Sequence, residues 1–253
     1  MTVLVPTMGS LHRGHQALIK RARALSKEVI VSIFVNPLQF ENKEDLEKYP
    51  RSPQLDIELA TLAGATEVWF PEYEDIYPGT IQTISAGPIG SILEGASRPA
   101  HFDGVLTVVN RLFEMVKPTH AVFGEKDFQQ LFLIKNIAKK VEIVSVPTVR
   151  NGSGLALSSR NIRLSQIEQE SAIIISKALS AAAQEKSVAS AQRVLEQVLS
   201  EEKAFKKDYA VIIDEKNFSF ATQESQKKRA LVAGWINGIR LIDNMPMDSG
   251  AHA

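Results

Sequence analysis

His12 and His15 are the residues best suited to chemistry, because they lie three positions apart with Gly14 between them. On a helical turn this spacing points both imidazoles in the same direction, and the glycine lets a flat ligand approach the backbone. Nearby, Thr7 can cap the turn and line the site, while Gly9 allows a tight turn. Unpaired amides at a helix start also favour phosphate. Two exposed histidines in a helix would show the same spacing, so their position in the fold has to decide.

A lysine and an aspartate form a second candidate group in the segment G-E-K-D, residues 124–127. Lys126 is a point charge suited to phosphate oxygens, and Asp127 can hold a ribose hydroxyl or orient the lysine. A solvated ion pair would explain the same two residues equally well.

Two hydroxyls and a guanidinium follow a segment rich in glycine and serine, residues 151–154. Ser158, Ser159 and Arg160 together suit a triphosphate. Because these residue types are also common on solvated loops, the group indicates nucleotide binding only in combination with the other two.

Two glutamines complete the set of candidates. Gln39 follows an apolar run that ends at Asn36, and Gln130 lies near the start of a predicted helix. We expect the two side chains to face each other across a crevice, where primary amides offer donors and acceptors without charge. That combination fits a small ligand with hydroxyl and carboxylate groups. An ordinary surface position is the alternative for either glutamine.

The candidate residues follow segments in which strands and helices are expected to alternate. Short β-branched runs predict strands, and apolar residues at helical spacing predict helices. Strands are expected at 3–5, 29–35, 67–70, 121–123 and 143–146, and helices at 11–25, 56–63, 105–116 and 128–138. This alternation predicts a Rossmann-like α/β domain, in which helices cover both faces of a parallel sheet and ligands bind at the carboxyl ends of the strands.

The pattern changes after residue 147. The sequence S-Q-I-E at residues 165–168 is a capping box that predicts the start of a long helix. Asn237-Gly238 is typical of a two-residue hairpin turn. The strands expected here are at 209–213, 229–236 and 239–244, and an unstructured tail is expected at 245–253.

Two domains follow from this change of pattern. We expect a Rossmann-like nucleotide-binding domain over residues 1–149 and a smaller α+β domain with antiparallel strands over residues 150–253.

The composition excludes several classes of protein. Lys plus Arg and Asp plus Glu both number 29, so the net charge is zero and no basic field is present to attract nucleic acid or anionic membranes. The chain has no cysteine, which excludes disulfides, thiolate nucleophiles and cysteine-bound metal clusters. Neither a signal peptide nor an apolar stretch of about 18 residues is found. We expect a cytoplasmic protein without nucleic-acid or membrane partners.

Several segments together carry a resemblance to a known family. They are P-T-M-G-S-L-H-R-G-H (6–15), S-I-F-V-N-P-L-Q-F (32–40), Y-P-R (49–51), L-E-G-A-S-R-P-x-H-F-D-G-V (93–105), F-G-E-K-D-F-Q-Q-L (123–131), V-P-T-V-R (146–150) and L-A-L-S-S-R-N (155–161). The combination resembles the pantothenate synthetase (pantoate-β-alanine ligase) family of the nucleotidylyltransferase-like superfamily. H-x-G-H by itself also marks other nucleotidylyltransferases and class I tRNA synthetases.

The resemblance implies a ligation in two steps that uses ATP and Mg2+. The pantoate carboxylate first attacks the α-phosphorus of ATP, which gives pantoyl adenylate and pyrophosphate. The β-alanine amine then attacks the activated carbonyl and releases AMP.

The resemblance also implies roles for individual residues. The implied ATP-binding residues are Thr7, Met8, Gly9, His12, Gly14, His15, Gly124, Glu125, Lys126, Asp127, Val149, Leu157, Ser158, Ser159 and Arg160. Those implied for pantoate or β-alanine are Gln39, Gln130, Asn36 and Arg98, while Asp56 is a candidate Mg2+ ligand. His15 corresponds to the family's catalytic proton donor. In physical terms, His12, His15 and Lys126 would stabilise charge on the α-phosphate and the leaving pyrophosphate.

The family is typically a homodimer, and its second domain acts as a lid, for which residues 151–154 are the expected hinge. Members usually carry a helix before the first strand, whereas this chain begins almost at that strand. We expect the additional helix to lie away from the crevice, so that its absence affects the edge of the first domain more than the chemistry.

Three other functions remain open at this point. A different H-x-G-H adenylyltransferase would usually need extra basic residues for a phosphorylated acceptor, and the paired glutamines argue against it. A non-catalytic ATP-binding module would have no use for the amide pair. A tRNA synthetase is disfavoured because the chain is short and lacks an evident anticodon-binding segment.

Overall fold

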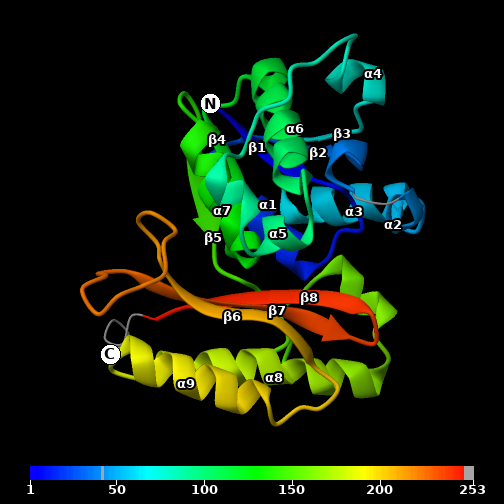
Figure 1. Ribbon diagram of the computed structural model, residues 1–253. Helices are drawn as coiled ribbons and strands as arrows, with labels where there is room; N and C mark the ends of the chain where they lie inside the picture. Colours follow the sequence, from blue (N-terminus) through cyan, green and yellow to red (C-terminus); the bar gives the residue numbers. More distant parts are fainter. Residues whose placement is uncertain (41–42, 248–253) are drawn as a thin grey trace. The chain divides into compact units, whose positions relative to one another are not determined.

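The computed structural model describes residues 1–40 and 43–247, and its contacts divide the chain into two compact units, Met1–Pro147 and Thr148–Ala253 (Figure 1). Each unit has its own cluster of buried apolar side chains. The sequence-based division lies slightly later, between residues 149 and 150.

The first unit is built on a five-stranded parallel sheet with the strand order β3-β2-β1-β4-β5. Val3, Leu4 and Val5 of the central strand are fully buried, as expected for a strand with helices on both faces. The Rossmann-like α/β fold is confirmed, and each predicted strand is present. The strands are β1 (Thr2–Thr7), β2 (Glu28–Ile33), β3 (Glu67–Trp69), β4 (His120–Gly124) and β5 (Glu142–Val146).

Helices connect these strands. They are α1 (Arg13–Leu25), η1 (Pro37–Gln39), α2 (Lys43–Glu47), α3 (Pro53–Ala63), α4 (Tyr73–Ile76), η2 (Pro88–Ser91), α5 (Glu94–Ser97), α6 (His101–Val116), η3 (Glu125–Asp127) and α7 (Phe128–Ile137). The sequence predicted α1, α3, α6 and α7. It did not predict the short helices, because one or two turns are too few to show a helical period.

The strand order creates a switch point between β1 and β4. The chain runs outward from β1 through β2 to β3, and then returns to pair β4 with the other side of β1. In open α/β sheets, ligands bind outside the carboxyl ends of the strands where the order reverses. The loops after Thr7 and Gly124 leave the sheet at this place.

The second unit is an antiparallel sheet packed with two helices. Its elements are η4 (Ser159–Arg163), α8 (Gln166–Ala183), α9 (Val188–Leu199), β6 (Lys206–Asp214), β7 (Lys228–Ile236) and β8 (Ile239–Pro246). The predicted capping box is present, since Ser165 and Glu168 bond each other's backbone amides at the start of α8. Asn237 and Gly238 both have positive φ, at 48° and 74°, as a hairpin turn of the expected kind requires.

The predicted tail is wrong for its first residues. β8 continues to Pro246, and the next residue, Met247, is buried with its amide bonded to the Lys228 carbonyl. The apolar side chain of Met247 belongs to the core of the second unit. Residues 248–253 lie outside the described part of the chain. Among the described residues, no helix combines the length and apolar character needed to cross a bilayer.

Candidate active site

The loop between β1 and α1 is held by an internal carboxylate. Asp56 of α3 is 1% exposed, and its two oxygens accept hydrogen bonds from Ser10 N at 3.0 Å and Leu11 N at 2.7 Å. Gly9 and Ser10 both have positive φ, at 86° and 52°, so the backbone turns sharply here. Thr7 bonds the Ser32 carbonyl at 2.9 Å, which ties the start of the loop to β2.

His12 and His15 form a capping box at the start of α1. The Nδ1 atom of His12 accepts from Gly14 N at 3.0 Å, and the Nδ1 atom of His15 accepts from His12 N at 3.3 Å. Their ring centroids are 4.2 Å apart. The structure therefore brings the two imidazoles together, as their spacing predicts. It also shows that amides expected to be open for phosphate are engaged within the loop.

Both histidines are neutral at pH 7. Burial is the main cause that lowers the pKa of His12 to about 4 and the pKa of His15 to about 3; Lys126 contributes to both shifts, and Asp127 opposes them. Because each Nδ1 accepts a backbone N–H, the ring proton is on Nε2. Each side chain can thus donate a neutral hydrogen bond from Nε2 to an acceptor such as a phosphate oxygen.

Lys126 and Asp127 lie next to this pair. They follow Gly124 at the end of β4, on the short helix η3, and β4 is the neighbour of β1 in the sheet. Lys126 Nζ is 3.8 Å from an Asp127 carboxylate oxygen. Both groups influence the pKa of the histidines, which confirms that the two loops adjoin. Glu125 is the first residue of the same short helix.

Gln39 follows β2, which flanks β1 on the side opposite β4, and its side chain is part of a hydrogen-bonded network. Its Nε2 atom points to the sulfur of Met8 at 2.7 Å, and its Oε1 accepts from Asn36 Nδ2 at 3.3 Å. Asn36 is 1% exposed, and it also bonds the Gly104 carbonyl, the Leu38 amide and the Tyr77 hydroxyl. All four hydrogen-bonding positions of the Asn36 amide are thus engaged. In this arrangement Asn36 orients Gln39, and its predicted contact with substrate stays a prediction.

Arg98 and His101 converge on the backbone of Gln39. His101 Nδ1 donates to the Gln39 carbonyl at 2.9 Å, and Arg98 donates to the same oxygen at 3.3 Å. Arg98 also lies 3.1 Å from His101 Nε2, which must be the acceptor because a guanidinium only donates. The sequence analysis missed His101, although its position three residues after Arg98 near a helix start could have indicated the contact.

Gln129 and Gln130 have different environments. Gln129 is 4% exposed and bonds the carbonyls of Ile89 and Ile92 and the amide of Glu94 at 2.8, 2.8 and 3.1 Å. It therefore holds the segment before α6. Gln130, one residue further along α7, is partly exposed.

In the second unit, the predicted nucleotide residues follow a closed turn. Leu157 N donates to the Val149 carbonyl at 2.9 Å, and Ser158 Oγ accepts from Arg160 N at 3.3 Å at the start of η4. Ser159 and Arg160 are partly exposed.

The expected hinge at residues 151–154 is not supported. Arg150, before the turn, is paired with Asp243 of β8, and Asn151 closes the turn by bonding Ser153 and Leu155. The segment is therefore fixed within the second unit on both sides. A hinge between the units would have to precede it.

The described residues do not form a magnesium cage. In residues 1–40 and 43–247, no group of three or more His, Cys, Asp or Glu side chains could hold a metal ion. Asp56, the predicted ligand, is buried, and both its oxygens are bonded to backbone amides. Its position does not fit direct coordination of a metal.

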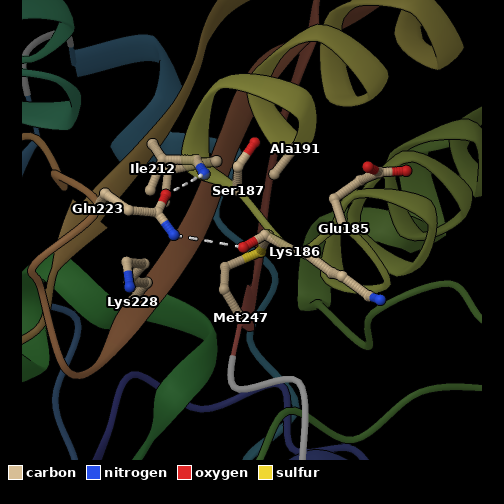
Figure 2. A pocket seen from close by; sticks show the side chains of 9 residues that line it. Glu185, Lys186, Ser187, Ala191, Ile212, Gln223, Lys228 and Met247 are labelled. Carbon is tan, nitrogen blue, oxygen red and sulfur yellow. Dashed lines mark hydrogen bonds between the residues drawn. The ribbon is translucent and has the colours of Figure 1, made fainter.

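A small cavity of about 60 Å³ lies elsewhere, at the start of α9 in the second unit (Figure 2). Gln223 crosses its wall, accepts from Val188 N at 3.3 Å and donates to the Lys186 carbonyl at 3.4 Å. These bonds secure the loop before α9, so we interpret the cavity as a packing gap beside a capped helix. None of the predicted site residues lines it.

Comparisons with known proteins decide the family. The family model described as pantoate-beta-alanine ligase matches residues 1–246. The chain belongs to the pantoate-β-alanine ligase family. Among curated relatives, pantothenate synthetases from a Nocardioides species and from Thermus thermophilus are each 45% identical to it, over 98% and 95% of this chain and 79% and 91% of their own lengths.

Solved structures of pantoate-β-alanine ligases share the fold. A crystal structure of pantothenate synthetase from Thermus thermophilus has a TM-score of 0.92 at 42% identity, with 97% of this chain and 93% of that chain covered. The enzyme from Francisella tularensis, complexed with beta-gamma ATP and β-alanine, has a TM-score of 0.80 at 37% identity, with 98% and 90% covered. The family resemblance seen in the sequence is confirmed.

Proposed function

We propose that the site around His12 and His15 condenses pantoate with β-alanine at the expense of ATP, through a pantoyl-adenylate intermediate. The chain is a pantoate-β-alanine ligase by family membership, and the proposal concerns how its residues perform this reaction. The observation that carries it is the position of the neutral histidine pair beside Lys126, at the switch point between β1 and β4.

In the adenylation step, ATP binds along residues 7–15 and 124–127. His12 and His15 donate from Nε2 to oxygens of the α-phosphate, and Lys126 neutralises charge on the departing pyrophosphate. The pantoate carboxylate attacks the α-phosphorus in line with the leaving oxygen. No proton has to move in this step, because both the attacking carboxylate and the leaving pyrophosphate are anions. The pKa of His15, about 3, supports a role as hydrogen-bond donor rather than as proton donor.

Pantoate is bound by the two glutamines. Asn36 bonds Gln39 Oε1, which leaves Gln39 Nε2 as the group that can donate to a hydroxyl or carboxylate of the substrate. Gln130 lies in the first turn of α7 and supplies the second amide. Arg98 supports Gln39 by donating a hydrogen bond to its backbone carbonyl. To bind the pantoate carboxylate directly, the Arg98 guanidinium has to exchange this partner for the substrate.

The second unit contributes contacts to the nucleotide. We expect the backbone at Val149 and Leu157 to contact ATP, and the side chains of Ser158, Ser159 and Arg160 to bind phosphate oxygens. In this role the second unit acts as a lid that excludes water during the reaction.

Three further properties complete the proposal. ATP enters as its Mg2+ complex, with the ion held by phosphate oxygens and water. The protein is a cytoplasmic homodimer. A monomer mass measured by small-angle scattering would contradict the dimer. Neither nucleic acid nor membrane is a partner, in keeping with the zero net charge.

Transfer of an oxygen isotope tests the proposed route. Pantoate labelled with 18O in its carboxylate is incubated with ATP and β-alanine, and the products are analysed by mass spectrometry. Attack by the carboxylate on the α-phosphorus places one labelled oxygen in AMP. Labelled inorganic phosphate with ADP as product would instead show attack at the γ-phosphorus and would refute the adenylate.

A further inference from the structure

We propose that Asp56 is a positioning residue for adenylation, which fixes the β1-α1 loop and thereby places the imidazoles of His12 and His15. This inference rests on the proposed function of that loop. It replaces the metal-binding role that the sequence suggests for Asp56 with a role in the geometry of the site.

The contacts of Asp56 are directed at the loop. Its carboxylate accepts from Ser10 N and Leu11 N, and Ser52 Oγ donates to the same carboxylate at 3.3 Å. The side chain is 1% exposed, so these donors take the place of water. A hydrogen bond to a buried carboxylate is stronger and more directional than one between neutral groups.

The loop needs such a partner because of its backbone. Gly9 and Ser10 have positive φ in succession, and Ser10 is a residue type that rarely adopts this conformation. The amides of Ser10 and Leu11 in this loop both point to one anion. In this protein the anion is the carboxylate of Asp56. An atom added at the Cβ position of Gly9 would lie 3.0 Å from Asp56 Oδ2, which shows how closely the two segments pack.

The fixed amides lie directly before the first histidine. Leu11 is followed by His12, whose amide donates to the ring of His15. Rotation of the loop would therefore move the His12 ring. It would also break the hydrogen bond from His12 N to His15 Nδ1, which sets the tautomer of His15. A displacement of about 1 Å in a site of this kind can lower the rate about 100-fold.

The same contacts restrict how phosphate can bind. Because the amides of Ser10 and Leu11 are bonded to Asp56, they are not free to cradle a phosphate as the amides of other glycine-containing loops do. Stabilisation of the charge on the reacting phosphate then depends on the imidazoles and on Lys126. This explains why a fixed geometry of the histidine pair matters for the step.

Substitution of Asp56→Asn tests the proposal, with Glu58→Gln as the matched control. Glu58 is an exposed carboxylate on the same helix. An amide in place of the Asp56 carboxylate can accept from only one of the two backbone amides at full strength. We expect Asp56→Asn to lower the maximal rate of pantoate-dependent pyrophosphate exchange about 100-fold with little change in the KM for ATP. Glu58→Gln should retain the wild-type rate.

The ring nitrogens provide a readout that a general loss of stability would not move. In the wild-type protein, NMR of 15N-labelled histidine should show Nδ1 without a proton and Nε2 with one, for both His12 and His15 at pH 7. In folded Asp56→Asn, recorded below its Tm, we expect the signals of this pair to change toward a mixture of tautomers. Unchanged tautomers together with unchanged exchange kinetics would overturn the positioning role.

Two further outcomes need their own tests: Asp56→Asn fails to fold, or the wild-type protein shows no exchange. If Asp56→Asn does not fold, Ser52→Ala provides a milder test, since it removes only the 3.3 Å bond and should lower the exchange rate a few-fold with only a small fall in Tm. An unchanged rate in that variant would contradict the proposal. If the wild-type protein shows no pantoate-dependent exchange while the tautomers change in Asp56→Asn, the proposed function fails and the structural role of Asp56 stands.

Discussion

The β1-α1 loop and the segment at residues 157–161 were both predicted to bind ATP, but they are built differently. In the first, a buried carboxylate fixes the backbone, and two imidazoles are held neutral with a defined tautomer. In the second, the hydroxyls and the guanidinium of Arg160 lie partly exposed on a short 3-10 helix. From this difference we expect the residues of the β1-α1 loop to stabilise the transition state and those at 157–161 to contribute to binding. Variants of the first should therefore change kcat, and variants of the second should change the KM for ATP.

The largest effect is expected for His15→Ala. Loss of a hydrogen-bond donor to the reacting phosphate should lower the rate of adenylate formation about 1000-fold, while the circular dichroism spectrum stays unchanged. Single-turnover measurement of pyrophosphate release checks this. His120→Ala is the control, because His120 lies at the amino end of β4, opposite the end that leads to Lys126. Equal losses in both variants, or retained activity in His15→Ala, would contradict the assignment.

Gln130→Ala and Gln129→Ala separate binding from support within one helix. Removing the Gln130 amide should lower kcat/KM for pantoate about 100-fold, because a polar group of the bound substrate loses its hydrogen-bond partner. We expect no change in Tm. Gln129→Ala should lower Tm, because three backbone groups lose their partner. Steady-state kinetics and thermal unfolding of both variants decide. A stability loss confined to Gln130→Ala would reverse the two roles.

Two arginines of the second unit provide a similar contrast. Arg160→Ala should raise the KM for ATP about tenfold at nearly constant kcat, in keeping with a partly exposed phosphate contact. Arg150→Ala should instead lower the free energy of unfolding by about 3 kcal/mol, because it removes the guanidinium that is ion-paired with the buried Asp243 carboxylate. Initial-rate kinetics and urea unfolding measure the two effects. An unchanged KM for ATP in Arg160→Ala would remove this residue from the site.

Gly104→Ala tests how closely α6 supports the pantoate site. An added Cβ would lie 2.3 Å from the Leu38 carbonyl oxygen, so the short helix that carries Gln39 must move. We expect a several-fold higher KM for pantoate. Alanine has the better helix propensity, which by itself would stabilise α6 by about 1 kcal/mol, but this gain does not restore the position of Gln39. Gly152→Ala is the control, since nothing lies within 4 Å of its added Cβ. Equal pantoate kinetics in the two variants would show that the turn adapts.

A separate expected effect, on stability and not on catalysis, is a pH dependence of the free energy of unfolding. The folded pKa values of His12 and His15, about 4 and 3, lie below the ordinary 6.5 of the unfolded chain. Below pH 6.5 the unfolded chain therefore binds protons that the folded chain does not, and stability falls as the pH falls. The slope is at most about 1.4 kcal/mol per pH unit for each histidine. Urea unfolding between pH 7 and 4.5 should show a shallower slope in His12→Ala, and an equal slope would contradict the lowered pKa.

The sequence predicts the fold well because its signals are local. The β-branched run that forms β2 and the apolar stripe of α6 identify their elements without knowledge of the contacts. The start of α6 is less clear from the sequence, because His101 and Phe102 precede the apolar stripe, which begins at Val105. The predicted tail failed for a different reason, since Met247 is ordered by packing against residues distant in the chain.

The candidate site is only partly predictable, because residue type does not show which hydrogen bonds are already made. Asn36 and Asp56 have the chemistry of ligand-binding residues, but their partners are backbone and side-chain groups of the same unit. Tyr77 lies in none of the motifs, and the spacing of His101 from Arg98 indicates a contact between these two residues but not their shared bond to the Gln39 carbonyl. The spacing of His12 and His15 did predict their proximity, because adjacent turns of a helix fix it.

Pyrophosphate exchange into ATP tests the central claim most directly, that the neutral histidine pair catalyses attack of pantoate on the α-phosphorus. Labelled pyrophosphate is incubated with the protein and ATP, with and without pantoate, and without β-alanine. We predict exchange that requires pantoate, stays constant between pH 6 and 8, and is lost in His15→Ala. Exchange without pantoate, or none in a folded protein that binds ATP, would contradict the account.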